Sequence, residues 1–177
     1  MKMISHRPKA ITCLILLLVG LNACKEAASK EPAVDAIIKM ENDKKAQFDA
    51  LKSFATNYAA AWSGKDPAAV AAFFAPEGSL KVNAGEPAVG REAITAVARG
   101  FMEAFPDIKV VMDSLVEQPD GLEFHWTLTG TYAGPEGAGN KVKISGFELW
   151  HLSAQGLVDT SIGQFDEEEY NRQLKGL

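Results

Sequence analysis

Four stretches of alternating apolar and polar residues in the second half of the chain constrain its fold most strongly. The clearest is residues 122–133, whose even-numbered positions are mostly large and apolar. A period of two is that of a strand with one buried face. Glycine-containing turns separate the four stretches, so we predict an antiparallel meander. Its strands cover residues 108–117, 122–133, 141–152 and 157–165.

The first half of the chain has the periodicity of helices. Apolar residues at spacings of three and four predict a helix over 34–63, with Gly64 as its stop. Asp66 and Pro67 are typical of an N-cap and a first helical position, so a short helix is predicted to follow and to end at Pro76. Helices followed by antiparallel strands indicate an α+β fold. A short strand, a long helix and a C-terminal helix complete the prediction, at 79–83, 89–105 and 166–177.

The N-terminus has the pattern of an export signal. A short basic region precedes the apolar run Ala10–Leu21, which is shorter than the roughly 20 residues of a membrane-spanning helix. The following "LNAC" resembles the bacterial lipobox, which implies cleavage before Cys24, a diacylglyceryl thioether on its sulfur and an acylated new N-terminus. The alternative is a plain secretory signal with an unmodified cysteine. With more than one acyl chain the anchor is stable, and we expect the protein at the periplasmic face of the bacterial outer membrane.

These features divide the chain into a signal peptide (1–23), a lipidated cysteine with its tether (24–45) and a folded domain (46–177). The folded domain has no cysteine, so its hydrophobic core must stabilise it without disulfides. Cleavage removes three cations and no anions, which changes the net charge from −5 to −8. An acidic domain argues against nucleic-acid binding. No His/Cys cluster has metal-ligand spacing, so we predict neither a metal nor a cofactor.

Several segments carry a family resemblance when they are taken in order. They include "FFAPEGSLKVN", "VGREAI", "AFPDIKV", "HWTLTGTYAG", "KVKISGFELWHLSAQGLV" and "FDEEEYNRQLKG". Together they resemble the SnoaL-like polyketide cyclases of the nuclear transport factor 2-like superfamily, over about residues 46–177. The resemblance implies a cone-shaped fold in which a curved antiparallel sheet packs on N-terminal helices. It also implies a small ligand in the cone and, where activity is present, acid/base chemistry without a cofactor.

Three residues are candidates for that chemistry. Asp166 lies where the cyclases keep their catalytic aspartate, although it also fits an N-cap of the last helix with Glu169 as capping-box partner. Glu148 is an acid between apolar neighbours on one face of a strand, where burial would raise its pKa. Alternatively, Glu148 is hydrogen-bonded to a neighbouring strand or solvated at a rim. Tyr132 stands where the cyclases carry a histidine, and its phenol can donate a hydrogen bond.

The same alternation selects a candidate pocket wall. In residues 122–132 the face with Trp126 is apolar, whereas His125 belongs to the other face, so His125 is expected outside or at a dimer interface. Large aromatic side chains belong more often to a core than to a ligand site, and both alternatives stay open for the tryptophans. The predicted pocket residues are Trp62, Trp126, Trp150 and Gln164.

Two functions follow as hypotheses. The first is a membrane-tethered domain that binds a small apolar molecule in its cone, with cyclase- or isomerase-like chemistry by Asp166, Glu148 and Tyr132. The second is a non-catalytic envelope module whose open sheet face binds a second copy or a partner. We expect a homodimer in either case.

Overall fold

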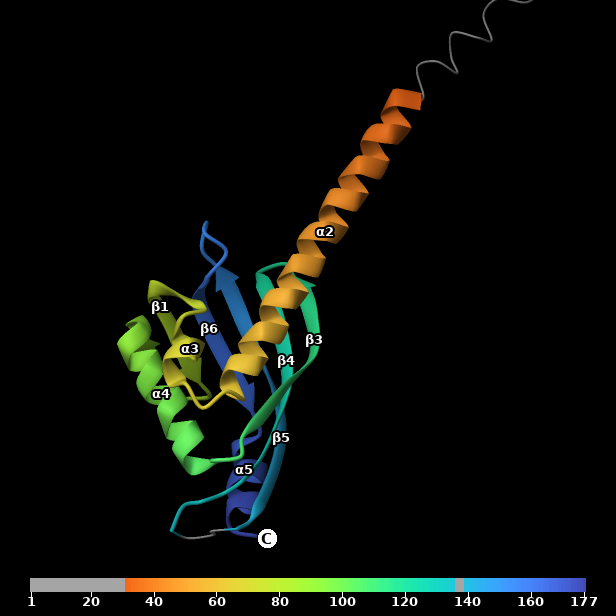
Figure 1. Cartoon of the computed structure of the whole chain (residues 1–177). Coiled ribbons are helices and arrows are strands. Elements are labelled where there is room, and N and C mark those ends of the chain that lie inside the picture. Colours follow the sequence, from red (N-terminus) through yellow and green to blue (C-terminus); the bar gives the residue numbers. More distant parts are fainter. Residues whose placement is uncertain (1–30, 136–138) are drawn as a thin grey trace, which may run out of the picture. The chain divides into compact units, whose positions relative to one another are not determined.

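The computed structural model describes residues 31–135 and 139–177, so the predicted signal peptide and Cys24 lie outside the described residues (Figure 1). The helices are α2 (Glu31–Trp62), α3 (Pro67–Ala71), α4 (Gly90–Ala104) and α5 (Glu167–Leu174). The strands are β1 (Phe74–Val82), β2 (Ala88–Val89), β3 (Lys109–Gln118), β4 (Gly121–Thr131), β5 (Lys141–Leu152) and β6 (Val158–Phe165). The predicted α+β class is confirmed, and β3 to β6 closely match the four predicted strands.

The chain divides into two units at the boundary between Ala46 and Gln47. Of the first unit, the structure describes the beginning of α2, where several large apolar side chains are exposed. No helix in the described ranges is long and apolar enough to span a membrane. The second unit, Gln47–Leu177, holds the sheet and the remaining helices.

The six strands form one sheet in the order β2-β1-β6-β5-β4-β3. The strands β3, β4, β5 and β6 pair antiparallel, as a meander requires. Strand β1 joins the other side of β6 in a parallel pair, and the two-residue β2 covers part of its outer edge. Figure 1 shows α3, α4 and the second half of α2 on one face of this sheet.

The segment after α3 differs from its prediction. Residues 72–76 were expected to complete a short helix closed by Pro76, but α3 ends at Ala71 and β1 begins at Phe74. Phe74 and Ala75 are buried, so an extended chain here adds apolar side chains to the core. Pro76 is tolerated because the register with β6 shifts between Phe74 and Ser79, and no regular ladder bond needs its missing N–H.

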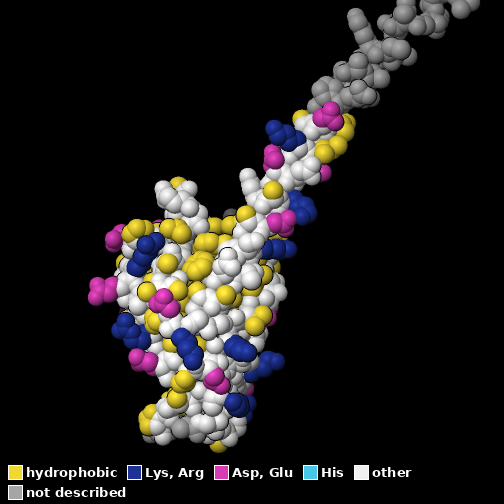
Figure 2. All heavy atoms as spheres, in the orientation of Figure 1, with side chains coloured by type: hydrophobic (Ala, Val, Ile, Leu, Met, Phe, Trp, Pro, Cys, Tyr) yellow, Lys and Arg dark blue, Asp and Glu magenta, His cyan; other side chains and the backbone are white. Residues whose placement is uncertain are grey.

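The hydrophobic core lies between the sheet and the helices of the second unit. Buried and partly exposed residues alternate along β4, with Leu122, Phe124, Trp126 and Leu128 on the buried side. Tyr58 of α2 is fully buried and packs edge-on against several aromatic rings, including Phe124. Acidic and basic side chains are interspersed with apolar ones on the surface drawn in Figure 2.

Candidate functional site

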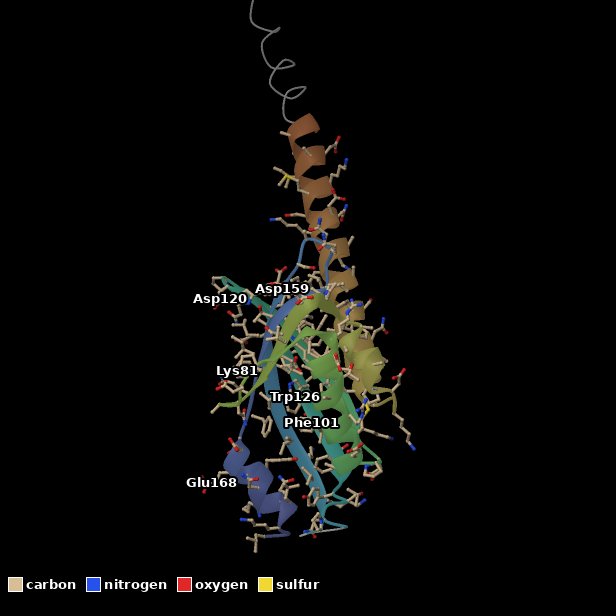
Figure 3. All side chains as sticks on the ribbon, turned by 90° about the vertical axis from the view of Figure 1, so that its left-hand side faces the viewer. Lys81, Phe101, Asp120, Trp126, Asp159 and Glu168 are labelled. Atoms are coloured by element: carbon tan, nitrogen blue, oxygen red, sulfur yellow. The ribbon has the colours of Figure 1, made fainter. Side chains whose placement is uncertain are left out.

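A small apolar cavity lies inside the second unit. Its walls include Trp62, Phe101, Trp126, Glu148, Gly163 and Phe165, together with aliphatic side chains from β1, β3 and β4. Its volume is about 50 Å³, enough for a few waters or a small organic molecule. Figure 3 labels Phe101 and Trp126, which line it from α4 and β4. Among its wall residues, only Glu148 is ionisable.

Three hydrogen-bond donors fix the carboxyl group of Glu148, which is only 7% exposed. Its Oε2 accepts from Ser161 Oγ at 2.6 Å, from Trp150 Nε1 at 2.9 Å and from the Tyr58 hydroxyl at 3.0 Å. Its Oε1 has only a longer contact, 3.4 Å, with the same Tyr58 hydroxyl. One oxygen is therefore saturated, and the other keeps capacity to exchange a proton or a hydrogen bond with a ligand.

The environment changes the acidity of this group. Burial raises the pKa of Glu148, and the hydrogen bonds from Ser161, Trp150 and Tyr58 partly oppose the increase. Burial, followed by the nearby charge of Glu148, raises the pKa of Tyr58 well above its usual value, so this phenol stays protonated as a donor. A carboxyl group with a raised pKa is better matched to proton transfer near neutral pH than an exposed one.

The raised pKa predicts a pH-dependent stability. Glu148 loses its proton near pH 4.5 in the unfolded chain but only at higher pH in the folded domain. Its contribution to stability is therefore complete below the unfolded-state pKa and is lost as the pH rises through the folded-state pKa. Urea unfolding across this window should show the wild type losing free energy of unfolding relative to Glu148→Gln as pH rises.

Glu169 provides a control of opposite sign. Hydrogen bonds from Arg172 lower its pKa to about 2, so its contribution is present above the unfolded-state pKa and is lost as the pH falls. The wild type should therefore gain stability relative to Glu169→Gln as the pH rises. A pH-independent difference between the wild type and Glu148→Gln would show that the pKa of Glu148 is not raised.

The four predicted pocket residues take different positions. Trp62 and Trp126 line the cavity. Trp150 is 1% exposed, stacks on Phe124 with ring centroids 4.7 Å apart and donates to Glu148 from behind the cavity wall. Gln164 is exposed on β6. Its two chain neighbours line the cavity, so the alternation of the strand turns Gln164 to the other face.

Asp166 lies outside the cavity wall and is exposed. Its Oδ1 accepts from the backbone N–H of Glu169 at 2.9 Å, which makes it the N-cap of α5. The predicted capping box is not completed as expected. The carboxylate of Glu169 accepts from Arg172 and Gln173 further along the helix instead. Asp166 is therefore the N-cap of α5, the alternative role considered for it, and the fold does not bring it together with Glu148.

The candidate Tyr132 also lies away from the cavity wall, as does His125, which was expected on the outer face. Tyr132 is partly buried, with its ring centroid 5.7 Å from that of Phe105. His125 lies on the opposite face of β4 from Trp126, where its Nε2 is 3.1 Å from Glu123 Oε2. Residues 31–135 and 139–177 contain no cluster of three His, Cys, Asp or Glu side chains suited to a metal.

Two residues that donate to Glu148, Tyr58 and Ser161, have no local sequence feature that marks them as part of a site. Tyr58 belongs to the apolar stripe of the long predicted helix, and Ser161 to a predicted strand. Strand alternation does place Ser161 on the same face as Gly163, which lines the cavity. The contact of Ser161 with Glu148 depends on the register between β5 and β6, which periodicity alone does not define. The contact of Tyr58 depends on how α2 packs on the sheet.

Comparison with known proteins gives a family and a fold. The family model described as a SnoaL-like domain matches residues 55–159. A protein from Catenulispora acidiphila with a ketosteroid isomerase-like fold, solved in complex with trimethylamine, is 21% identical with a TM-score of 0.62, and the match covers 70% of this chain and 92% of that one. Comparison with curated proteins gives no match.

Two further solved structures have similar folds. A candidate SnoaL-like polyketide cyclase from Jannaschia is 19% identical with a TM-score of 0.58, over 66% of this chain and 83% of that one. A phenazine biosynthesis-related protein from Pseudomonas aeruginosa is 14% identical with a TM-score of 0.57, over 71% of this chain and 89% of that one. At these identities the likeness shows the fold alone.

Proposed function

This chain belongs to the SnoaL-like domain family, and from that premise we propose that its second unit binds a small, largely apolar molecule in the cavity. We also propose that Glu148 performs cofactor-free acid/base chemistry on the bound molecule, of the cyclase or isomerase type. The position of Glu148 carries the proposal. It is the ionisable residue among the apolar walls of the cavity, and three donors already bond to one of its two carboxyl oxygens.

The reaction requires only a proton and an electron pair to move. The carboxylate of Glu148 takes a proton from a carbon atom next to a carbonyl group of the substrate, and the C–H electron pair moves into that carbonyl. The protonated carboxyl then returns the proton to another position of the substrate. Alternatively, the carbanion attacks a second carbonyl, and the carboxyl returns its proton to the alkoxide oxygen that this forms. The desolvated wall and the raised pKa of Glu148 both favour such a transfer.

Binding is testable with a small hydrocarbon such as methylenecyclopentane. We expect it to perturb the indole N–H resonances of Trp62 and Trp126 in nuclear magnetic resonance spectra, because both rings line the cavity. Gly163→Val should abolish binding. A Cβ at Gly163 would lie 3.4 Å from its nearest neighbours, Glu148 Cγ and Lys81 O, which is ordinary van der Waals contact. Because Gly163 lines the cavity, we expect the two methyl groups of valine to occupy it.

Gln164→Val is the matched control, because it places the same valine side chain at the neighbouring, exposed position. This variant should bind the hydrocarbon as the wild type does. Absence of binding to the folded wild type would refute the proposal and favour the alternative of a non-catalytic module. Equal binding by the wild type and a folded Gly163→Val variant would place the ligand elsewhere.

We further propose that Cys24 carries a lipid that tethers the domain to the cell envelope. Its support is the order of basic region, apolar run and "LNAC" in the sequence. Mass spectrometry of protein expressed in a Gram-negative host and extracted from its membranes should show acyl mass on Cys24. Cys24→Ala should release the protein from the membrane fraction. An unmodified cysteine in the full-length wild type would refute the tether.

A further inference from the structure

The first turns of α2 carry a group of exposed apolar side chains. Of the eight large apolar side chains that are exposed in the described part of the chain, four lie within seven residues: Val34, Ile37, Ile38 and Met40. They are 49–59% exposed, and apolar side chains are visible on this stretch in Figure 2. Single exposed apolar residues are normal on a protein surface, but a contiguous group is typical of a surface that binds a partner or a membrane. We call these four residues the apolar face of α2.

The apolar face of α2 is one-sided and short. At 3.6 residues per turn its four side chains fall within about 160° of the helix circumference, and Asp35 and Lys39 lie on the opposite side. In the next turn Glu41 and Lys44 take the same side as the apolar face and end it. A coiled coil with a second copy needs apolar positions sustained over three or more heptads. A face of two turns fits a lipid surface better, because a bilayer needs no matching partner positions along the helix.

The length of chain before α2 limits how far this face can lie from the proposed lipid anchor. Glu31, the first residue of α2, is the seventh residue after Cys24. An extended chain spans at most about 3.6 Å per residue and a helix about 1.5 Å, so Val34 lies within about 30 Å of an acylated Cys24. Contact between α2 and the bilayer is then an intramolecular event with a high effective concentration, and a weak affinity for lipid is enough.

We propose that the apolar face of α2 inserts into the bilayer that holds the Cys24 anchor, at the boundary between headgroups and acyl chains. This inference rests on the proposed lipid tether and adds a second contact with the membrane. Residues 31–46 contain four acidic residues and three lysines, so net charge does not attract this segment to anionic headgroups. The attraction is the burial of the four apolar side chains, and the contact should not depend on anionic lipid.

Labelling of the acylated protein in phosphatidylcholine vesicles tests the inference. Signal cleavage removes Cys13 and acylation blocks Cys24, so the thiol of Ile37→Cys is the one that an environment-sensitive fluorophore modifies. Lys39→Cys is the matched control, because it carries the same fluorophore on the other side of the helix. Lipids with spin-labelled acyl chains should quench the fluorophore at position 37 at least about threefold more strongly than at position 39, since an inserted helix buries only its apolar face, by about 5–10 Å.

Mass spectrometry of the same samples separates the inference from the tether. If Cys24 carries acyl mass but the lipids quench both positions equally, the inference is overturned and the tether stands. The same holds if quenching requires an anionic lipid, or if the fluorophore at position 37 is shielded only at a high ratio of protein to lipid, which would mean that a second copy covers the face. Absence of acyl mass on Cys24 would refute the tether and the inference with it.

Discussion

Replacing Glu148 with leucine should lower the free energy of unfolding by about 3–5 kcal/mol. Leucine has a similar volume, so little of this loss comes from a cavity. It comes from Tyr58, Trp150 and Ser161, whose buried donors all bond to Glu148 Oε2 and would have no acceptor in the variant. Urea unfolding at a pH below the folded-state pKa of Glu148 measures the loss without the cost of a buried charge.

Glu148→Gln is the control for this prediction, because its amide oxygen still accepts hydrogen bonds from the three donors. We expect it to cost about 1–2 kcal/mol, clearly less than leucine. If leucine at this position were as stabilising as glutamate, the three donors would not depend on the carboxyl group, and the buried network would not explain why an acid lies there.

The sequence-based account of the fold rested on periodicity, and periodicity explains where it succeeded. Strands β3 to β6 alternate over eight or more residues with clear turns between them, so their limits and their buried faces were predictable. The start of β1 was not predictable, because residues 72–76 have no alternation and a proline such as Pro76 typically ends a helix or strand. The gain from burying Phe74 against the core outweighs that local preference.

The site was predictable only as far as strand faces define it. Alternation predicted the inner face for Trp126 and the outer one for His125, and it put Glu148 between apolar neighbours without deciding between the cone and a rim. It could equally have excluded Gln164, which follows Gly163 on β6 and must face the other way. The three donors to Glu148 come from α2, β5 and β6, and no local pattern specifies which positions of these elements meet.

The catalytic proposal predicts its largest effect in α-hydrogen exchange. In deuterated water, a base that removes the α-hydrogen of cyclopentanone replaces it with deuterium, and the loss of the proton signal gives the rate. We expect exchange to be faster with the wild type than in buffer alone. The enzymatic rate of Glu148→Gln should be at least about 100-fold lower than that of the wild type, since an amide cannot accept the proton. Glu148→Gln should still bind the ketone, which separates chemistry from binding.

Asp166→Asn supplies the most direct comparison, because asparagine preserves the N-cap while removing the carboxylate that the family resemblance marks as the base. The decisive measurement is the exchange rate of wild type, Glu148→Gln and Asp166→Asn under one set of conditions. Our account predicts exchange by the wild type and Asp166→Asn and its loss in Glu148→Gln. Loss in Asp166→Asn with retention in Glu148→Gln, or a wild-type rate equal to that of buffer, would contradict it.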